Sequence, residues 1–507
     1  MSAGMSAGTP GVDVPPLAQP PAAIVLPAIH ESRLANGLTL IVVPRPGLPV
    51  VSLVLSVRAG PEADPTGRAG VAALTVALLS KGAQRHGRAV SATQLAQQAE
   101  ALGGTLDSDS SWQASSVSMS VTTPQTQSAL ALLADVLRRP LLAAAELERA
   151  RTQSLDGLRV ALGSPGEVAA MAARRAFWGP TPHGAVATQA SLRRITRADV
   201  QAFHARWFRP DNALLVLAGD IDPSTARTLA HAALGSWPAP VAALPAATAQ
   251  APQAMSETLL QVDLPGSGQS AVLLTAPYLA SLPKLVGPLG LTGQSSQPSL
   301  TADPDLRAQS RTELRAELRT PQRVAQVANA VLGGGYSARL NQELRIRRGL
   351  SYGAFSQAES QPAGGMLTAQ AQTRHASAIQ ALTLMRAEIA RMTELPPAAD
   401  ELAARQASLL GSFARRLQTT GGLAALVTGQ WIQGRPLADL AGYSDAVLTV
   451  RPEQVRDFAR LHWGAERLRA VVVGDLAAMG AGWQAEPSLR WTLPQLEGAL
   501  GAAEAAR

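Results

Sequence analysis

The apolar and polar positions of this chain follow two different periods. Residues 91–102, 123–137 and 376–393 repeat apolar side chains every three to four positions, which predicts amphipathic helices. Short apolar runs such as residues 271–275 and 365–372 lie between the helical segments and predict strands. The mixture predicts an α+β protein in which helices pack on one face of each sheet.

One segment of the chain recurs about 255 residues later. Residues 196–221 resemble residues 450–476, and each copy predicts a helix ending in Trp, a polar turn and a buried strand. The matched positions are Val200 and Val455, Phe203 and Phe458, Trp207 and Trp463, Gly219-Asp220 and Gly474-Asp475. This repeat predicts a duplicated α/β unit of about 220 residues.

Composition along the chain predicts the boundaries of the two copies. Residues 1–30 are rich in Pro and Ala and predict a flexible extension, and residues 239–257 predict a linker of similar composition. The two domains are then residues 31–238 and 258–500. Within the second domain, the irregular and charged stretch 279–320 predicts an insertion whose role the sequence does not define.

The residue composition excludes several kinds of site. The 507 residues include no cysteine, which excludes disulfides, thiolate metal sites and a cysteine nucleophile. The formal net charge is +7, yet the basic runs are short and acidic residues lie between them. This pattern does not predict a nucleic-acid interface, which needs a concentrated basic stripe.

Neither a membrane span nor an intact signal peptide is predicted. No apolar run approaches the ~20 residues that a bilayer requires. The first residues lack a charged segment followed by a clean apolar core. We expect a periplasmic location, with the cytoplasm as the alternative.

The stretch GGGYSARLNQELRIRRGLSYGAFS, residues 333–356, carries the most specific chemistry. Residues 336–348 predict a helix with Leu340, Leu344 and Ile346 on its apolar side, which Gly349 ends before a returning strand. Arg345 in the last turn and Tyr352 early in the strand are therefore predicted to lie side by side. Both can donate hydrogen bonds to one carbonyl oxygen or oxyanion, and neither holds a metal unaided.

Two other interpretations of this stretch stay open. A solvated arginine at a helix end and a half-buried strand tyrosine would also complement a helix dipole and a core edge. Arg347 and Arg348 are neighbouring candidates for the arginine role, although they lack the seven-residue spacing to Tyr352.

This stretch resembles the carboxy-terminal half of the M16 (pitrilysin-type, M16B) zinc peptidases. The matching positions are Gly333–Gly335, Arg339-Leu340, Arg345, Gly349-Leu350 and Tyr352. The resemblance implies that Arg345 and Tyr352 act on substrate and that Gly333, Gly334 and Gly335 line its binding site. It also implies two homologous α/β sandwich repeats of the LuxS/MPP-like metallohydrolase fold. Each repeat would hold a mainly antiparallel sheet with helices on one face, and the two would form a clamshell.

The first half resembles the same family but lacks its metal ligands. Residues 34–60 predict two strands joined by a Pro/Gly turn, similar to the opening hairpin of the family. Ala73, Val76 and Ala77 occupy the positions of the family's His-x-x-Glu-His zinc motif. Gly157 falls at the third ligand position, and a shift of one residue would place Asp156 there. The sequence therefore predicts no zinc site in this chain.

The histidines supply no replacement for this motif. No two of the seven lie within five residues of each other, so no helical ligand pair exists. His204 and His462 fall near the ends of the matched helices in the two copies, and packing or capping roles are predicted for both.

The resemblance implies a zinc-less subunit that works with a partner. In that hypothesis a homologous subunit with an intact motif holds the zinc, and the two chains form a heterodimer that cleaves an extended peptide. This chain would supply Arg345 and Tyr352 and would be inactive alone. The alternative is a non-catalytic structural or peptide-binding subunit of a larger assembly.

Overall fold

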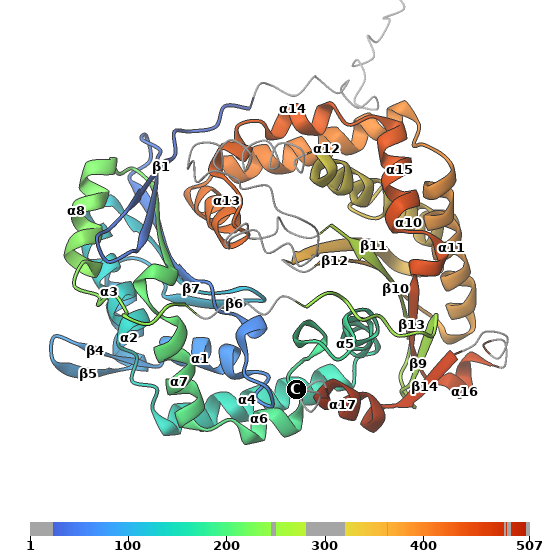
Figure 1. The fold of residues 1–507 in the computed structure, drawn as a ribbon, viewed down its shortest axis with the longest axis horizontal. Helices are drawn as coiled ribbons and strands as arrows, with labels where there is room; N and C mark the ends of the chain where they lie inside the picture. The colour runs from blue at the N-terminus through green and yellow to red at the C-terminus, as the bar shows by residue number, and fades with distance from the viewer. Residues whose placement is uncertain are drawn as a thin grey trace, which may run out of the picture.

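The computed structural model describes residues 24–244, 250–279, 320–361, 364–480, 483 and 488–502. Two halves, each built around a six-stranded sheet, face each other across the middle of the molecule (Figure 1). The strands of the first half all precede the predicted linker, and those of the second half all follow it. The α+β class and the two sheet-containing halves are thereby confirmed.

The first sheet has its most apolar strand near the centre. Its order is β1 (His30–Arg33), β2 (Thr39–Pro44), β8 (Ala213–Gly219), β3 (Val50–Val57), β7 (Ala114–Thr122) and β6 (Asp107–Ser111). β8 is buried along its whole length and pairs parallel with β2 and antiparallel with β3. The predicted opening hairpin is therefore wrong, because β8 separates the two strands that would form it.

The second sheet repeats the topology of the first. Its order is β11 (Ser351–Gln361), β12 (Gly364–Thr373), β10 (Ser270–Tyr278), β13 (Arg469–Gly474), β9 (Leu259–Asp263) and β14 (Ser488–Thr492). Read from the other edge, β9-β13-β10-β12-β11 matches β2-β8-β3-β7-β6, with the same parallel and antiparallel pairs. This shared order supports the duplication that the repeated segment predicts.

The helices surround the two sheets (Figure 1). In the first half they are α1 (Val71–Leu79), α2 (Ala92–Ala101), α3 (Thr126–Arg138), α4 (Ala144–Leu162), α5 (Pro165–Trp178), α6 (Gln189–Arg194), α7 (Arg197–Trp207) and α8 (Pro223–Leu234). The second half holds a helix over residues 320–332, then α10 (Arg339–Asn341), α11 (Ala378–Glu394), α12 (Ala399–Leu417), α13 (Thr420–Ile432), α14 (Tyr443–Leu448), α15 (Pro452–His462), α16 (Leu476–Met479) and α17 (Leu493–Ala502). α2, α3 and α11 confirm three of the predicted helices.

Each half contributes one helix to the sheet of the other half. α5 of the first half packs on β10 and β13, and α13 of the second half packs on β3 and β8. Arg58 of the first half stacks on the Trp431 ring of α13, with its Cζ 3.9 Å from the ring centroid. The prediction of helices on one face of each sheet was incomplete. The central strands are apolar on both faces, so helices pack on both faces of each sheet and exclude water from them.

The matched helices α7 and α15 end in similar aromatic packing. His204 stacks on Phe208 and His462 packs against Phe458, each with ring centroids 4.6 Å apart. Burial lowers the pKa of both histidines. Of the two predicted roles, packing and capping, these ring contacts confirm packing.

Parts of the predicted extension, linker and insertion lie outside the described residues, namely residues 1–23, 245–249 and 280–319. Residues 24–29 have no regular secondary structure, but Ile24, Leu26 and Ile29 pack against the large core that links the two halves.

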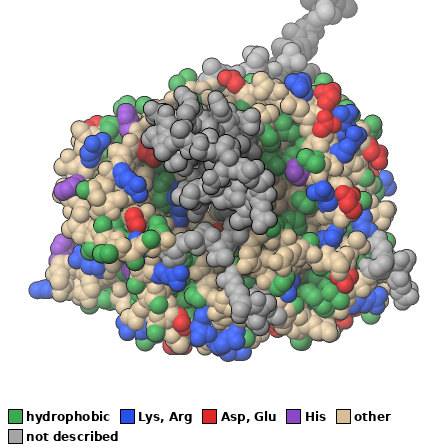
Figure 2. All heavy atoms as spheres, in the orientation of Figure 1, with side chains coloured by type: hydrophobic (Ala, Val, Ile, Leu, Met, Phe, Trp, Pro, Cys, Tyr) green, Lys and Arg blue, Asp and Glu red, His purple; other side chains and the backbone are tan. Residues whose placement is uncertain are grey.

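No helix within the described ranges is long and apolar enough to cross a bilayer. On the face shown in Figure 2, basic and acidic side chains are interspersed.

Candidate functional site

The Gly-rich turn is held in place by α12. The helix that follows it begins at Arg339, not at Tyr336 as predicted. Arg405 donates to the carbonyl oxygen of Ser337 at 2.8 Å, and Arg339 pairs with Glu401 at 2.7 Å. These contacts hold residues 336–338 in a turn, so the helix starts three residues later.

A π-helix over residues Gln342–Arg347 continues α10. Gly349, with φ of +61°, ends it, as the sequence predicts. Leu340 and Leu344 are fully buried, whereas Ile346 is 47% exposed, so its predicted place on the apolar side is wrong. The wider π-turn alters the rotation between successive residues and turns Ile346 outward. Such turns are frequent at functional sites.

Tyr352 lies in a β-bulge at the start of β11. The register between β11 and β12 shifts between Ser351 and Ala354, so Tyr352 and Gly353 fall outside the regular ladder. A bulge bends its strand and redirects side chains. Tyr352 is consequently 90% exposed, which makes it one of the most exposed large side chains in the described parts of the chain.

The structure brings Arg345 and Tyr352 together. The Cζ atom of Arg345 lies 4.9 Å from the centroid of the Tyr352 ring, within cation–π range. The same atom lies 5.0 Å from the ring of Tyr336, a residue that the sequence reasoning missed. The sequence placed Tyr336 inside a helix, although its position after three glycines is a signal for an exposed turn.

The other arginines of this segment are engaged by carboxylates. Arg347 and Arg348 both pair with Glu343, at 3.0 and 2.8 Å. The hydrogen bond from Arg348 and the contacts with Arg347 lower the pKa of Glu343 below its usual value. For Arg345 no ion pair is found among the described residues. Arg345 is thus the arginine of this helix that remains available to a ligand.

The three glycines differ in how closely other atoms approach them. A Cβ atom on Gly333 would lie 2.4 Å from the Ser356 nitrogen, and one on Gly334 would lie 2.7 Å from the Ala330 Cα. The nearest atom to a Cβ on Gly335 is 3.8 Å away. Close packing therefore explains why positions 333 and 334 hold glycine. The role of all three glycines in binding substrate stays a prediction.

In the first half, the three motif positions lie on α1. Val76 is buried, Ala77 is half-buried, and Ala73 is exposed and lines a cavity of about 250 Å³ together with Trp112. Methyl and isopropyl groups neither ligate a metal nor move a proton. Within the described residues, no group of three or more His, Asp or Glu side chains could hold a metal ion. These residues do not fit the zinc that the family motif would bind.

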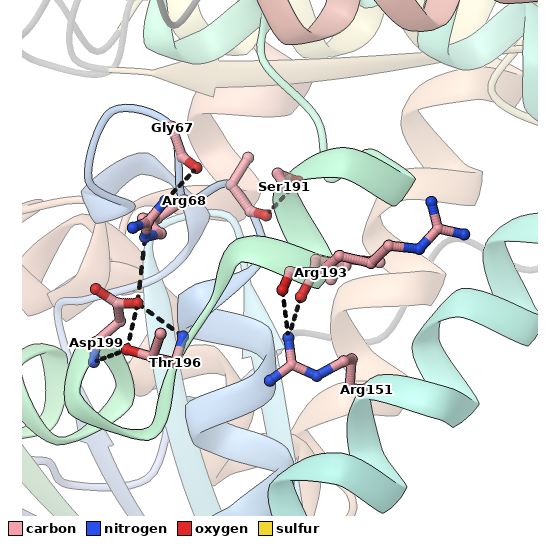
Figure 3. A network of polar contacts seen from close by, with 9 residues as sticks. Gly67, Arg68, Arg151, Ser191, Arg193, Thr196 and Asp199 are labelled. Carbon is pink, nitrogen blue, oxygen red and sulfur yellow. Dashed lines mark hydrogen bonds and ion pairs between the residues drawn. The ribbon is translucent and has the colours of Figure 1, made fainter.

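The segment that leads into α1 is nevertheless held by specific polar contacts. Arg68 pairs with Asp199 at 3.2 Å, and Ser191 donates to the carbonyl oxygen of Ala69 at 2.8 Å (Figure 3). The Asp64 carboxylate accepts hydrogen bonds from the Gly70 and Ala72 amides, at 2.6 and 2.8 Å. Burial raises the pKa of Asp64 to about 7, although these two hydrogen bonds oppose the shift.

The position on α4 that corresponds to the family's third zinc ligand also lacks a suitable side chain. A Cβ atom on Gly157 would meet nothing within 4 Å, and the neighbouring Asp156 is exposed and pairs with Arg159 at 2.8 Å. α4 itself is fixed to α6 by Arg151, which donates to the carbonyl oxygens of Leu192 and Arg193 (Figure 3). The helices of a metal site are present here without its ligands.

Comparisons with known proteins agree with this geometry. A family profile described as the peptidase M16 inactive domain matches residues 194–409, and one described as insulinase (peptidase family M16) matches residues 41–184. Ala73, Val76 and Ala77 lie in the part of the chain that the insulinase profile matches, and the inactive-domain profile covers Arg345 and Tyr352.

Two relatives illustrate the range of similar proteins. An uncharacterized zinc protease of Mycobacterium bovis is 25% identical over 345 residues, which cover 66% of this chain and 68% of the relative. The non-peptidase homolog YmxG of Helicobacter pylori is 20% identical over 430 residues, which cover 84% of this chain and 90% of the relative.

Solved structures show the same fold. A peptidase M16 inactive domain from Pseudomonas fluorescens aligns with a TM-score of 0.73 and 23% identity, covering 88% of this chain and 98% of that structure. A protease from Helicobacter pylori aligns with a TM-score of 0.75 and 17% identity, covering 89% of this chain and all of that structure. Since the two family profiles together match more than half of its residues, the chain belongs to the M16 peptidase family.

Proposed function

We propose that this chain is the zinc-less subunit of a two-subunit M16 peptidase. Its contribution is a pair of hydrogen-bond donors, Arg345 and Tyr352, which act on a peptide held between the two subunits. The homologous partner supplies the metal chemistry. The observation that carries this proposal is the exposed contact between Arg345 and Tyr352, with Cζ 4.9 Å from the ring centroid.

The chemistry of the pair suits a peptide bond under attack. The Tyr352 hydroxyl donates a hydrogen bond to the carbonyl oxygen as negative charge develops on it. The Arg345 guanidinium donates to a neighbouring carbonyl oxygen and adds a fixed positive charge. Removing one such donor typically costs a factor of about 10² to 10³ in rate. A buried arginine–tyrosine contact would serve packing alone, whereas here the tyrosine is 90% exposed.

Co-purification with a partner tests this proposal. The chain is expressed with an M16 homologue from the same organism that contains His-x-x-Glu-His, and cleavage of an unstructured peptide is measured. Tyr352→Phe and Arg345→Ala are each expected to reduce kcat/KM about 100-fold while the complex still forms. Arg347→Ala is the matched control, because Arg347 pairs with Glu343, and it should retain activity. Unchanged cleavage in both Tyr352→Phe and Arg345→Ala would refute the assigned roles.

A second candidate function is a non-catalytic structural or peptide-binding subunit. The match of residues 194–409 to an inactive domain favours this alternative. It predicts that no M16 partner becomes a better peptidase when this chain is added. Measurement of cleavage by the partner alone and by the pair separates the two functions.

The periplasm is the location that we propose for either function, and cell fractionation with an antibody against the chain tests it.

A further inference from the structure

We propose that Tyr336 is a third ligand-binding group of this site and that Asn341 is the residue that positions it. The ligand class is the acceptor oxygens of a peptide, and this inference rests on the proposed function of the same site. Tyr336 and Tyr352 would bind such oxygens together with Arg345.

The first observation is the symmetry of the contacts around Arg345. Its Cζ atom lies 5.0 Å from the Tyr336 ring and 4.9 Å from the Tyr352 ring. Two contacts of this kind restrict a long side chain that would otherwise sample many rotamers. The guanidinium therefore lies between two rings, and these contacts reduce its rotamer freedom before a ligand arrives.

The second observation is the exposure of both rings. Tyr336 is 64% exposed and Tyr352 is 90% exposed. No hydrogen bond to either hydroxyl group is found in the part of the chain that the structure describes. The remaining tyrosines, Tyr278 and Tyr443, instead pack in or against the core. An exposed ring adds little to core stability, so packing alone does not explain Tyr336.

The third observation is the way in which Asn341 fastens Tyr336 to the site. Asn341 is 3% exposed, and its side-chain nitrogen donates to the carbonyl oxygen of Tyr336 at 2.6 Å. Its side-chain oxygen accepts from the amide of Ala354 on β11 at 3.1 Å. One buried amide thus joins the turn that carries Tyr336 to the strand that carries Tyr352. Donor and acceptor are both used, which fixes the orientation of the amide group.

The charge around the three residues favours an acceptor ligand. Guanidinium and phenol groups present N–H and O–H donors, and the nearby Glu343 carboxylate is already occupied by Arg347 and Arg348. A peptide offers such acceptor oxygens in its backbone carbonyls and in its terminal carboxylate. The same donors could bind either group, so the test includes both.

The small number of tyrosines makes the site directly observable. The chain has four tyrosines, so protein labelled with 3-fluorotyrosine gives four fluorine resonances. The probe is a short unstructured peptide of Leu, Arg, Ser and Gly, made with a free and with an amidated carboxy terminus. We expect the Tyr336 and Tyr352 resonances to shift together on titration, while those of Tyr278 and Tyr443 stay in place. Retained binding of the amidated peptide identifies backbone carbonyls, and its loss identifies the terminal carboxylate.

Four variants separate the roles. Tyr336→Leu removes the ring and should weaken peptide binding about ten-fold, and Tyr336→Phe, which keeps the ring, should weaken it about three-fold. Asn341→Leu should weaken binding about as much as Tyr336→Leu and should shift the Tyr352 resonance of the free protein. Ile346→Ala, on the same helix, should change neither. Wild-type binding by Tyr336→Leu, with an unchanged Tyr352 resonance, would overturn the proposal.

Peptide binding and peptide cleavage are measured separately, so the inference and the proposed function can fail separately. If cleavage by the pair depends on Arg345 and Tyr352 while Tyr336→Leu binds the peptide like the wild type, this inference fails and the proposed function survives. If the three residues bind peptide but no M16 partner gains activity from the chain, the proposed function fails and this inference survives. Should Asn341→Leu lower only the melting temperature and leave affinity and resonances unchanged, Asn341 has a structural role alone.

Discussion

Two of the arginine–aromatic clusters among the described residues differ in their exposure to solvent, since one is buried and the other is exposed. In the buried cluster, Arg174 of α5 lies over Trp112, with Cζ 4.0 Å from the ring, and Trp112 and Trp178 both contact the ring of His183. In the exposed cluster, Arg345 contacts Tyr336 and Tyr352 at 5.0 and 4.9 Å. The chemical groups are alike, but their surroundings differ.

Strand β11 connects the two clusters. Tyr352 lies near its start, and Glu359, seven residues later, pairs with Arg174 at 3.4 Å. The Arg174 side chain is only 13% exposed, and its carboxylate partner comes from the opposite half of the molecule. The buried cluster therefore joins the halves, whereas the exposed cluster presents its donors to solvent. A cation on an aromatic ring is a candidate binding group only when no carboxylate of the same chain already occupies it.

The largest effect is expected at the turn that supports the exposed cluster. Gly333→Ala places a Cβ atom 2.4 Å from the backbone nitrogen of Ser356, and it also threatens the hydrogen bond from that nitrogen to the Gly333 carbonyl oxygen. Because backbone must move on both sides, we expect the free energy of unfolding to fall by about 3 kcal/mol. Denaturant unfolding followed by circular dichroism measures this change.

Gly335→Ala is the matched control in the same turn. The nearest atom to its added Cβ is 3.8 Å away, so the loss should stay below about 1 kcal/mol. Equal destabilisation by the two substitutions would mean that the close approach of the turn to β11 does not hold in solution.

The exposed cluster shows where sequence reasoning works and where it stops. Arg345 and Tyr352 could be placed together because only a local helix end, Gly349 and a returning strand separate them. The start of the helix could not be predicted, because it depends on Glu401 and Arg405, more than sixty residues away along the chain. Tyr336 was missed although a local signal was present, because it follows three glycines that are typical of a turn.

The fold likewise has parts that the local sequence predicts and parts that depend on residues far apart along the chain. Helices such as α2 and α11 follow from the period of their own apolar positions. β8 lies between β2 and β3 because it pairs with strands that are about 160 residues away along the chain. Leu53 of β3, for example, lies opposite Leu217 of β8. The packing of α5 and α13 on the sheet of the opposite half also depends on residues far away along the chain. The apolar period of a helix does not specify which sheet the helix covers.

The next effect concerns the pH dependence of the buried cluster. Burial and then the charge of Arg174 lower the pKa of His183 to about 4, and neither ring nitrogen has a hydrogen-bond partner among the described residues. The unfolded chain binds a proton near pH 6.5, whereas the folded chain does not until about pH 4. Stability therefore falls as the pH drops from 6.5 toward 4, by about 2 kcal/mol at pH 5.

His183→Phe should remove most of this acid sensitivity while keeping the stacked ring. Thermal unfolding between pH 8 and pH 5 measures the slope for both proteins. The exposed His231, replaced by Gln, is the control and should leave the slope unchanged. A His183→Phe protein that loses stability with acid as steeply as the wild type would show that other groups dominate this pH range.

The last prediction compares the two arginines directly. Arg174→Ala removes a desolvated cation–π contact and an ion pair between the halves, so the free energy of unfolding should fall by about 1.5 kcal/mol. Arg345→Ala removes contacts to two exposed rings and should cost less than about 0.5 kcal/mol. Peptide binding should show the reverse order, with the larger loss in Arg345→Ala. If both substitutions destabilise the chain equally, exposure and ion pairing do not distinguish the two clusters, and Arg345 is better explained as a structural residue.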